Sequence, residues 1–140
     1  MAVVITVTYD GARSCTAEHG PSGARLRTVP PVDNGGDGSS FSPTDLVATG
    51  YATCVLTILA MRAEAHGLDL TGTTARVEKH MSADAPRRIV QLPVIVMVPA
   101  DVAARIPADK RSALEAAACE CPVCVTLGDR VKMPVSFEWT

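Results

Sequence analysis

The residues of this sequence best suited to chemistry are its five cysteines: Cys15, Cys54, Cys119, Cys121 and Cys124. An ionised thiol is a strong nucleophile and a metal ligand, and a nearby cation favours its ionised form. No segment resembles a secretory signal, so we expect the chain in the reducing interior of the cell. An odd number of cysteines is a poor basis for structural disulfides there. These thiols are therefore inert core residues, metal ligands or catalysts.

Cys54 lies in the middle of a segment that is predicted to be an apolar helix. A buried free cysteine packs like a small hydrophobic residue, and spacing alone favours that inert role. A thiol so far from the helix N-terminus gains little from the helix dipole, which fades beyond the first turn. A reactive Cys54 would need a cation from elsewhere in the fold.

The segment Cys119-Glu-Cys-Pro-Val-Cys124 allows three interpretations. Its C-P-x-C pair resembles glutaredoxin-like redox motifs, but those open a helix, whereas we expect this segment at a helix end. A C-x-C-x-x-C zinc site would need a fourth ligand, and the three histidines are far apart in sequence. In the third interpretation, one of these cysteines forms a disulfide with an oxidised Cys54. Spacing alone does not decide among them.

Arg13 and Asp45 have ordinary explanations. Arg13 falls in a predicted strand, where it would be a solvated edge residue, and Cys15 would share its face of the strand. Asp45 completes a capping box with Ser42 at a helix start. No serine-hydrolase elbow, phosphate loop or dinucleotide fingerprint is present.

The elements that must position these residues follow from periodicity and turn signals, and they predict an α+β fold. Three strands come first, then a loop rich in Gly and Pro, a long helix, two strands, a second helix and a last strand. The expected ranges are strands 2–9, 12–18 and 24–29, loop 30–40, helix 42–65, strands 73–81 and 87–98, helix 109–120, and strand 131–139. At 140 residues, the chain is expected to be one domain, 1–140.

The composition narrows the classes of partner. A hydrophobic content of 47% with 20% charged residues is typical of a globular protein. A net charge of −2 supplies no basic field for nucleic acid. The apolar stretch Leu46–Met61 is interrupted by threonines and Gly50, so we do not expect it to span a membrane, and we expect the protein in the cytoplasm. A long helix that is apolar on most sides also favours burial against a partner subunit.

Three short motifs together resemble the OsmC/Ohr family, that is, osmotically inducible protein C and the organic hydroperoxide resistance proteins. They are Phe41-Ser-Pro-Thr-Asp-Leu46, Gly50-Tyr-Ala-Thr-Cys54 and Cys121-Pro-Val. The resemblance covers nearly the whole chain. It implies an OsmC-like fold, an intertwined homodimer with sites at the subunit interface, and a cysteine-based peroxidase that reduces organic hydroperoxides.

The resemblance also implies roles for individual residues. Cys54 would be the peroxidatic cysteine and Cys121 the resolving one. Arg13 would activate the thiol, with Arg25 as a weaker match, and Asp45 would hold that arginine. The family needs no bound cofactor or metal, and an external dithiol, in this family a lipoyl group, is the expected reductant. Two rival functions are a non-catalytic protein that binds a small apolar ligand and a metal-binding or redox-sensing protein built on the C-terminal cysteines.

Overall fold

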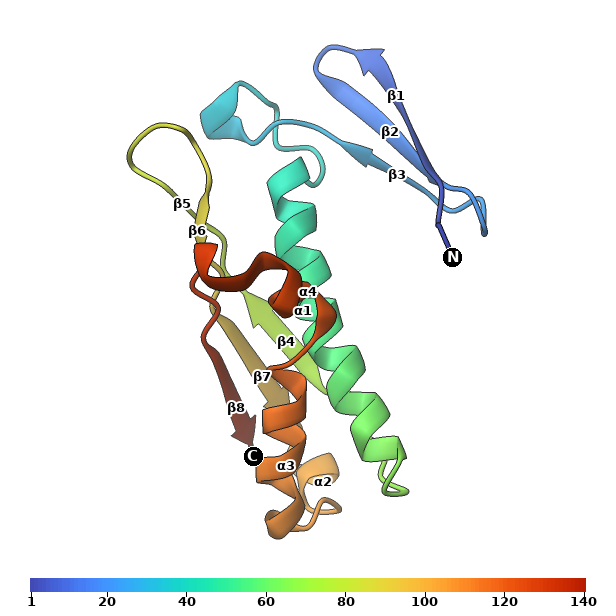
Figure 1. The fold of residues 1–140 in the computed structure, drawn as a ribbon, viewed down its shortest axis with the longest axis vertical. Coiled ribbons are helices and arrows are strands. Elements are labelled where there is room, and N and C mark those ends of the chain that lie inside the picture. Colours follow the sequence, from blue (N-terminus) through green and yellow to red (C-terminus); the bar gives the residue numbers. More distant parts are fainter. The chain divides into compact units, whose positions relative to one another are not determined.

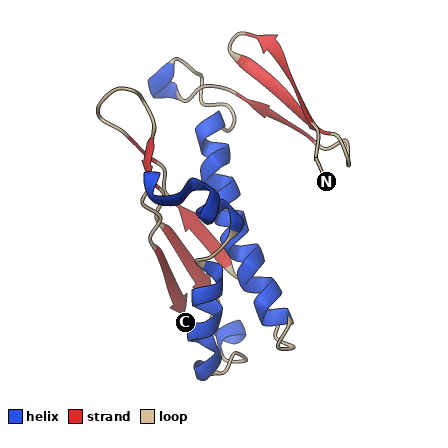
Figure 2. Cartoon of the chain, viewed as in Figure 1, coloured by secondary structure: helices blue, strands red, loops and turns tan.

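The computed structural model describes residues 1–140, and its contacts divide the chain into two compact units, Met1–Val47 and Ala48–Thr140. The division falls inside the long helix α1, Pro43–Glu64. Strands dominate the first unit, whereas the second combines helices with strands (Figures 1 and 2). The predicted α+β class is confirmed, and the single domain stays a prediction.

The first unit contains a three-stranded antiparallel sheet, as the meander pattern predicts. Its strands are β1 (Ile5–Gly11), β2 (Ser14–His19) and β3 (Arg25–Thr28), in the order β1-β2-β3. The loop predicted at 30–40 follows and contains a single 3₁₀ turn, η1 (Val32–Asn34). This loop requires Gly36, because a Cβ at that position would overlap the carbonyl oxygen of Pro30.

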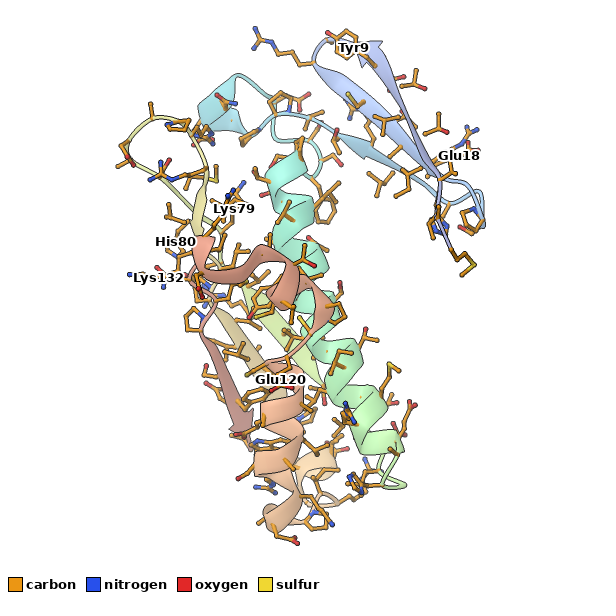
Figure 3. All side chains as sticks on the ribbon, viewed as in Figure 1. Tyr9, Glu18, Lys79, His80, Glu120 and Lys132 are labelled. Atoms are coloured by element: carbon orange, nitrogen blue, oxygen red, sulfur yellow. The ribbon has the colours of Figure 1, made fainter.

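One face of this sheet is apolar and exposed. On β1, Ile5, Val7 and Tyr9 alternate with threonines, and their side chains are 60%, 61% and 66% exposed. Tyr9 is labelled in Figure 3. Leu26 continues the same face on β3, because Ala17 pairs with both Val7 and Leu26. An apolar sheet face of this kind usually packs against another layer.

The β1–β2 connection differs from the prediction. Gly11 pairs with Ser14, so the turn consists of Ala12 and Arg13 alone. Both have positive φ, 51° and 63°, the pattern of a type I′ hairpin turn. The predicted strand ranges 2–9 and 12–18 leave Asp10-Gly11 as the turn, two residues early, because Gly usually supplies positive φ. Arg13 therefore lies in a turn and does not share a strand face with Cys15.

Helix α1 begins and ends within two residues of its predicted bounds. The predicted capping box is present: the Asp45 amide donates to Ser42 Oγ at 3.1 Å, and the Ser42 amide donates to Asp45 Oδ2 at 2.9 Å. From Ala48 onward a buried stripe follows the helix at three- and four-residue spacing: Ala48, Tyr51, Ala52, Val55, Leu59 and Ala63.

By length and hydropathy alone, α1 could also cross a membrane. The core helix of a soluble protein passes the same test, and the buried stripe of α1 belongs to the hydrophobic core. Full burial of Val55 and Leu59 stabilises this packing by about 1.5–3 kcal/mol for each side chain.

The second unit has a three-stranded sheet, β4 (Thr74–Val77), β7 (Val94–Val98) and β8 (Val135–Trp139), in the order β4-β7-β8. The β4–β7 pair is antiparallel and the β7–β8 pair is parallel. Every second residue of β7, from Val94 to Val98, is buried and joins α1 in the core. Figure 1 shows α1 beside this sheet.

The long strands predicted at 73–81 and 87–98 are each divided in two. The outer parts form a separate pair, β5 (His80–Met81) and β6 (Ile89–Gln91). The break in the second strand falls at Pro93, which has no amide hydrogen for the ladder. Glu78 lies opposite, with its amide donating to the Pro93 carbonyl at 3.1 Å, and both strands are interrupted at this point.

Three helices connect β7 with β8: α2 (Ala100–Ala103), α3 (Ala108–Ala118) and α4 (Pro122–Leu127). A 3₁₀ turn, η2 (Gly128–Arg130), follows. Helix α3 replaces the predicted helix 109–120, and α2 and α4 were not predicted. The sequence predicted that the segment containing Pro122 would lie at a helix end, but Pro122 occupies the first turn of α4. Proline is well tolerated there because that amide has no intrahelical partner.

Candidate functional site

The structure brings Cys54 and Cys121 together, although 66 residues separate them in the sequence. Their side chains lie close enough to interact electrostatically, one in the middle of α1 and the other at the junction of α3 and α4. Cys54 is partly buried and Cys121 is fully buried. Both thiols are free. Two thiols in this position can be joined as a disulfide by a two-electron oxidation.

Cys121 is the N-cap residue of α4. The Cys124 amide donates to Cys121 Sγ at 3.4 Å, as an N-cap side chain normally accepts from the third helical residue. Burial raises the pKa of the Cys121 thiol, and the contact with Cys54 raises it further. The amides of Cys124 and Val123 act in the opposite direction without reversing the shift. Cys121 is therefore a neutral thiol near pH 7.

Tyr51 is a residue of this region that sequence reasoning did not single out. It precedes Cys54 by three residues, a spacing that places two residues on neighbouring parts of one helix face. Its hydroxyl donates to the Met133 carbonyl at 3.2 Å. Burial raises its pKa, and charge on the three C-terminal cysteines raises it further. Tyr51 is thus a neutral phenol. Its spacing of three residues from Cys54 on the same helix was the feature of the sequence that could have identified it.

The other two C-terminal cysteines lie on either side of Cys121. Cys119 is exposed at the end of α3, beside Glu120, which is labelled in Figure 3, and Cys124 is partly buried in the first turn of α4. Partial burial of its thiol raises the pKa of Cys119 although the residue as a whole is exposed, and the charges of Cys124 and Glu115 add to the shift. No three His, Cys, Asp or Glu side chains converge as ligands for a metal ion. The zinc interpretation therefore has no geometric support.

The two candidate arginines of the first unit have different partners. The Arg13 guanidinium donates to the Gly35 carbonyl at 2.8 Å, and its amide donates to Tyr9 Oη at 3.2 Å. Arg25 forms an exposed ion pair with Glu18 across the β2–β3 pair. Left-handed backbone costs a non-glycine residue roughly 1–2 kcal/mol, and such strain is often found at functional sites. This favours Arg13 over Arg25 as a functional residue.

Asp45 is half-buried, and its carboxylate caps α1 as described above. Asp45 also has a further interaction. The capping role accounts for the local conformation of this residue.

Comparisons with known proteins identify the family and the fold. The family model of the OsmC-like proteins matches residues 36–136. A solved structure from Psychrobacter arcticus, of a protein assigned by its name to the osmotic stress induced and detoxification response, is 34% identical. It superposes with a TM-score of 0.88 over 98% of this chain and 96% of its own.

Two more distant structures share the fold. The organic hydroperoxide resistance protein OsmC from Legionella pneumophila is 20% identical, with a TM-score of 0.76 over 99% of this chain and 97% of its own. The organic hydroperoxide resistance protein OhrB of Bacillus subtilis is 17% identical, with a TM-score of 0.69 over 99% of this chain and 98% of its own. No curated protein matches the chain.

Proposed function

Because this chain belongs to the OsmC-like protein family, which includes organic hydroperoxide resistance proteins, we propose that it is a thiol peroxidase that reduces organic hydroperoxides to alcohols. The observation that carries the proposal is that the Cys54 and Cys121 thiols lie close enough to interact. A peroxidase of this type needs a second thiol within reach of the first, and the fold supplies one from a distant part of the chain.

The chemistry follows from the two thiols. The Cys54 thiolate attacks the terminal peroxide oxygen, the O–O bond breaks, and the alkoxide leaves as an alcohol after it takes up a proton. Cys54 is then a sulfenic acid. The neutral Cys121 thiol condenses with it, which forms the S–S bond and releases water. The disulfide protects Cys54 from further oxidation.

Arg13 and Asp45 complete the proposed site. A guanidinium beside a thiol favours the thiolate, and it can also donate hydrogen bonds to the peroxide. Arginine suits this role because its planar group has several donors in a fixed geometry. We assign Asp45 to holding Arg13 by an ion pair.

The reductant is proposed to be an external dithiol, such as a lipoyl group, which restores both thiols by exchange. The reaction needs no bound cofactor or metal, and we place the protein in the cytoplasm. Neither nucleic acid nor a membrane has a part in it.

The apolar face of the N-terminal sheet supports a homodimer as the working form. A second copy of the chain could bury Val7 and its apolar neighbours, which are exposed on β1. We expect Val7→Lys to weaken dimerisation at least about tenfold, because a charge replaces a side chain worth about 1.5–3 kcal/mol when buried. Sedimentation of micromolar protein measures the change.

Thr8→Lys is the matched control, since Thr8 is the next residue on β1 and lies on the polar face. It should leave the dimer intact. A wild-type protein that sediments as a monomer would contradict the dimer proposal.

The function is tested with wild-type protein and dihydrolipoamide as reductant, by chromatographic measurement of the alcohol formed from tert-butyl hydroperoxide, and the rate of dihydrolipoamide oxidation gives kcat/KM for both peroxides. The half-buried stripe around Cys54, which includes Leu46 and Ile58, favours an alkyl group next to the peroxide. We therefore expect kcat/KM for tert-butyl hydroperoxide to exceed that for hydrogen peroxide at least about tenfold, since a few buried methyl groups supply that energy. Similar values for both peroxides would contradict the substrate preference, and no alcohol would contradict the function.

A further inference from the structure

The segment Cys121-Pro-Val-Cys124 opens a helix, which the sequence did not predict. Cys121 is the N-cap of α4, Pro122 lies in the first turn, and Cys124 is the third helical residue. This is the position that a redox-active C-x-x-C pair occupies at a helix start. The sequence counted against a redox role because redox motifs of this kind open a helix and this segment was expected only to end one. The structure shows that the segment does open a helix.

The geometry of the pair suits a disulfide. An N-cap residue and the third helical residue have Cα atoms roughly 5 Å apart by helix geometry. A disulfide requires about 4.4–6.8 Å between its Cα atoms. The side chain of Cys121 already contacts the backbone of Cys124, at 3.4 Å from sulfur to amide nitrogen. Closing the pair therefore needs side-chain rotation and little movement of the helix.

The Cys121 sulfur also lies close to Cys54. It therefore stands between two thiols, one on α1 and one on α4. It is fully buried, whereas Cys124 is partly exposed and is followed by Val125, which is 71% exposed. An external dithiol can approach α4 more readily than it can approach the sulfur of Cys121.

We propose that Cys124 is a third redox-active cysteine, which takes over the disulfide from Cys54 and presents it to the external dithiol. This relay rests on the proposed peroxidase function. The Cys124 thiolate attacks the Cys121 sulfur of the Cys54–Cys121 disulfide. The Cys121–Cys124 bond forms, the Cys54–Cys121 bond breaks, and Cys54 leaves as a thiolate. The external dithiol then reduces Cys121–Cys124 and is itself oxidised to a disulfide.

The relay predicts a stoichiometry that a two-cysteine mechanism does not. Without reductant, the wild type should convert about two equivalents of tert-butyl hydroperoxide per chain, because the first leaves Cys54 free to react again. Mass spectrometry should then find a Cys121–Cys124 disulfide and, with dimedone present, an adduct on Cys54. Cys124→Ser should convert about one equivalent and stop at Cys54–Cys121, with no adduct. Cys119→Ser, which changes an exposed neighbouring thiol, should behave as the wild type.

The outcomes separate the relay from the function on which it rests. If wild type and Cys124→Ser both form one equivalent of alcohol and a Cys54–Cys121 disulfide, the relay is wrong and the peroxidase stands. If neither forms alcohol, the peroxidase is wrong. Cys54→Ser in a glutathione redox buffer tests the pair without peroxide. A Cys121–Cys124 disulfide there supports the pair, and a protein that keeps both thiols free or carries only mixed disulfides with glutathione overturns it.

Discussion

Cys54→Ser should abolish peroxidase activity, with a fall in kcat/KM of roughly three orders of magnitude or more, because a hydroxyl is not ionised near pH 7 and cannot replace the thiolate. The substitution changes one atom and keeps the hydrogen-bonding capacity toward Cys121. The fold should therefore be retained. Alcohol production from tert-butyl hydroperoxide measures the effect, and circular dichroism confirms that the helices persist.

Cys119→Ser is the control for this experiment, since Cys119 is exposed and lies outside the Cys54–Cys121 contact. It should keep the wild-type rate within about twofold, the range of a surface change. Activity that survived in Cys54→Ser would show that another group attacks the peroxide. The protein would then be a member of the family with different chemistry.

Arg13→Ala should lower kcat/KM roughly 100-fold, which corresponds to the loss of about 2.7 kcal/mol from one or two charge-assisted hydrogen bonds. The alkylation rate of Cys54 by iodoacetamide at pH 7 should fall in parallel, because the guanidinium favours the thiolate. This second measurement is needed because Arg13 also ties the β1–β2 turn to the loop at Gly35. A purely structural role would lower stability and leave the alkylation rate unchanged.

Arg25→Ala is the matched control, because it removes a guanidinium from the same sheet. Its exposed ion pair with Glu18 contributes little, typically under about 1 kcal/mol, so activity should stay within about twofold of the wild type. If Arg25→Ala instead caused a large loss of activity and Arg13→Ala caused none, Arg25 would be the arginine that activates the thiol. Arg13→Lys should recover part of the activity, since it restores charge without the planar donor group.

Local signals in the sequence were sufficient for part of the fold. The capping box of Ser42 and Asp45 predicted the start of α1, because capping depends on residues that are close in the chain. The meander was also predictable from alternation and turn signals. The OsmC-like fold and the candidate pair Cys54 and Cys121 came from the resemblance of three motifs, and no local pattern joins these two residues.

The remaining features depend on contacts or on unusual backbone. Arg13 has a positive φ that its residue type disfavours, so no propensity could place it in the turn. Helix α4 was missed because Pro122 can either end one helix or start another, and packing decides between them. The proposed redox pair Cys121 and Cys124 could not be recognised from the sequence, because its position at a helix start depends on α4. The divided strands likewise depend on the pairing partners of β6 and β7.

The closeness of the Cys54 and Cys121 thiols affects what happens to the oxidised protein. Cys54 is carried by a helix whose Val55 and Leu59 are fully buried, so this stretch of backbone opens only when most of the core opens. On the proposed chemistry, ring closure would need no unwinding of α1, and the reacting atoms would be held at a high effective concentration. The sulfenic acid would be short-lived. The interval in which a second peroxide could convert it to an irreversible sulfinic acid would be correspondingly brief.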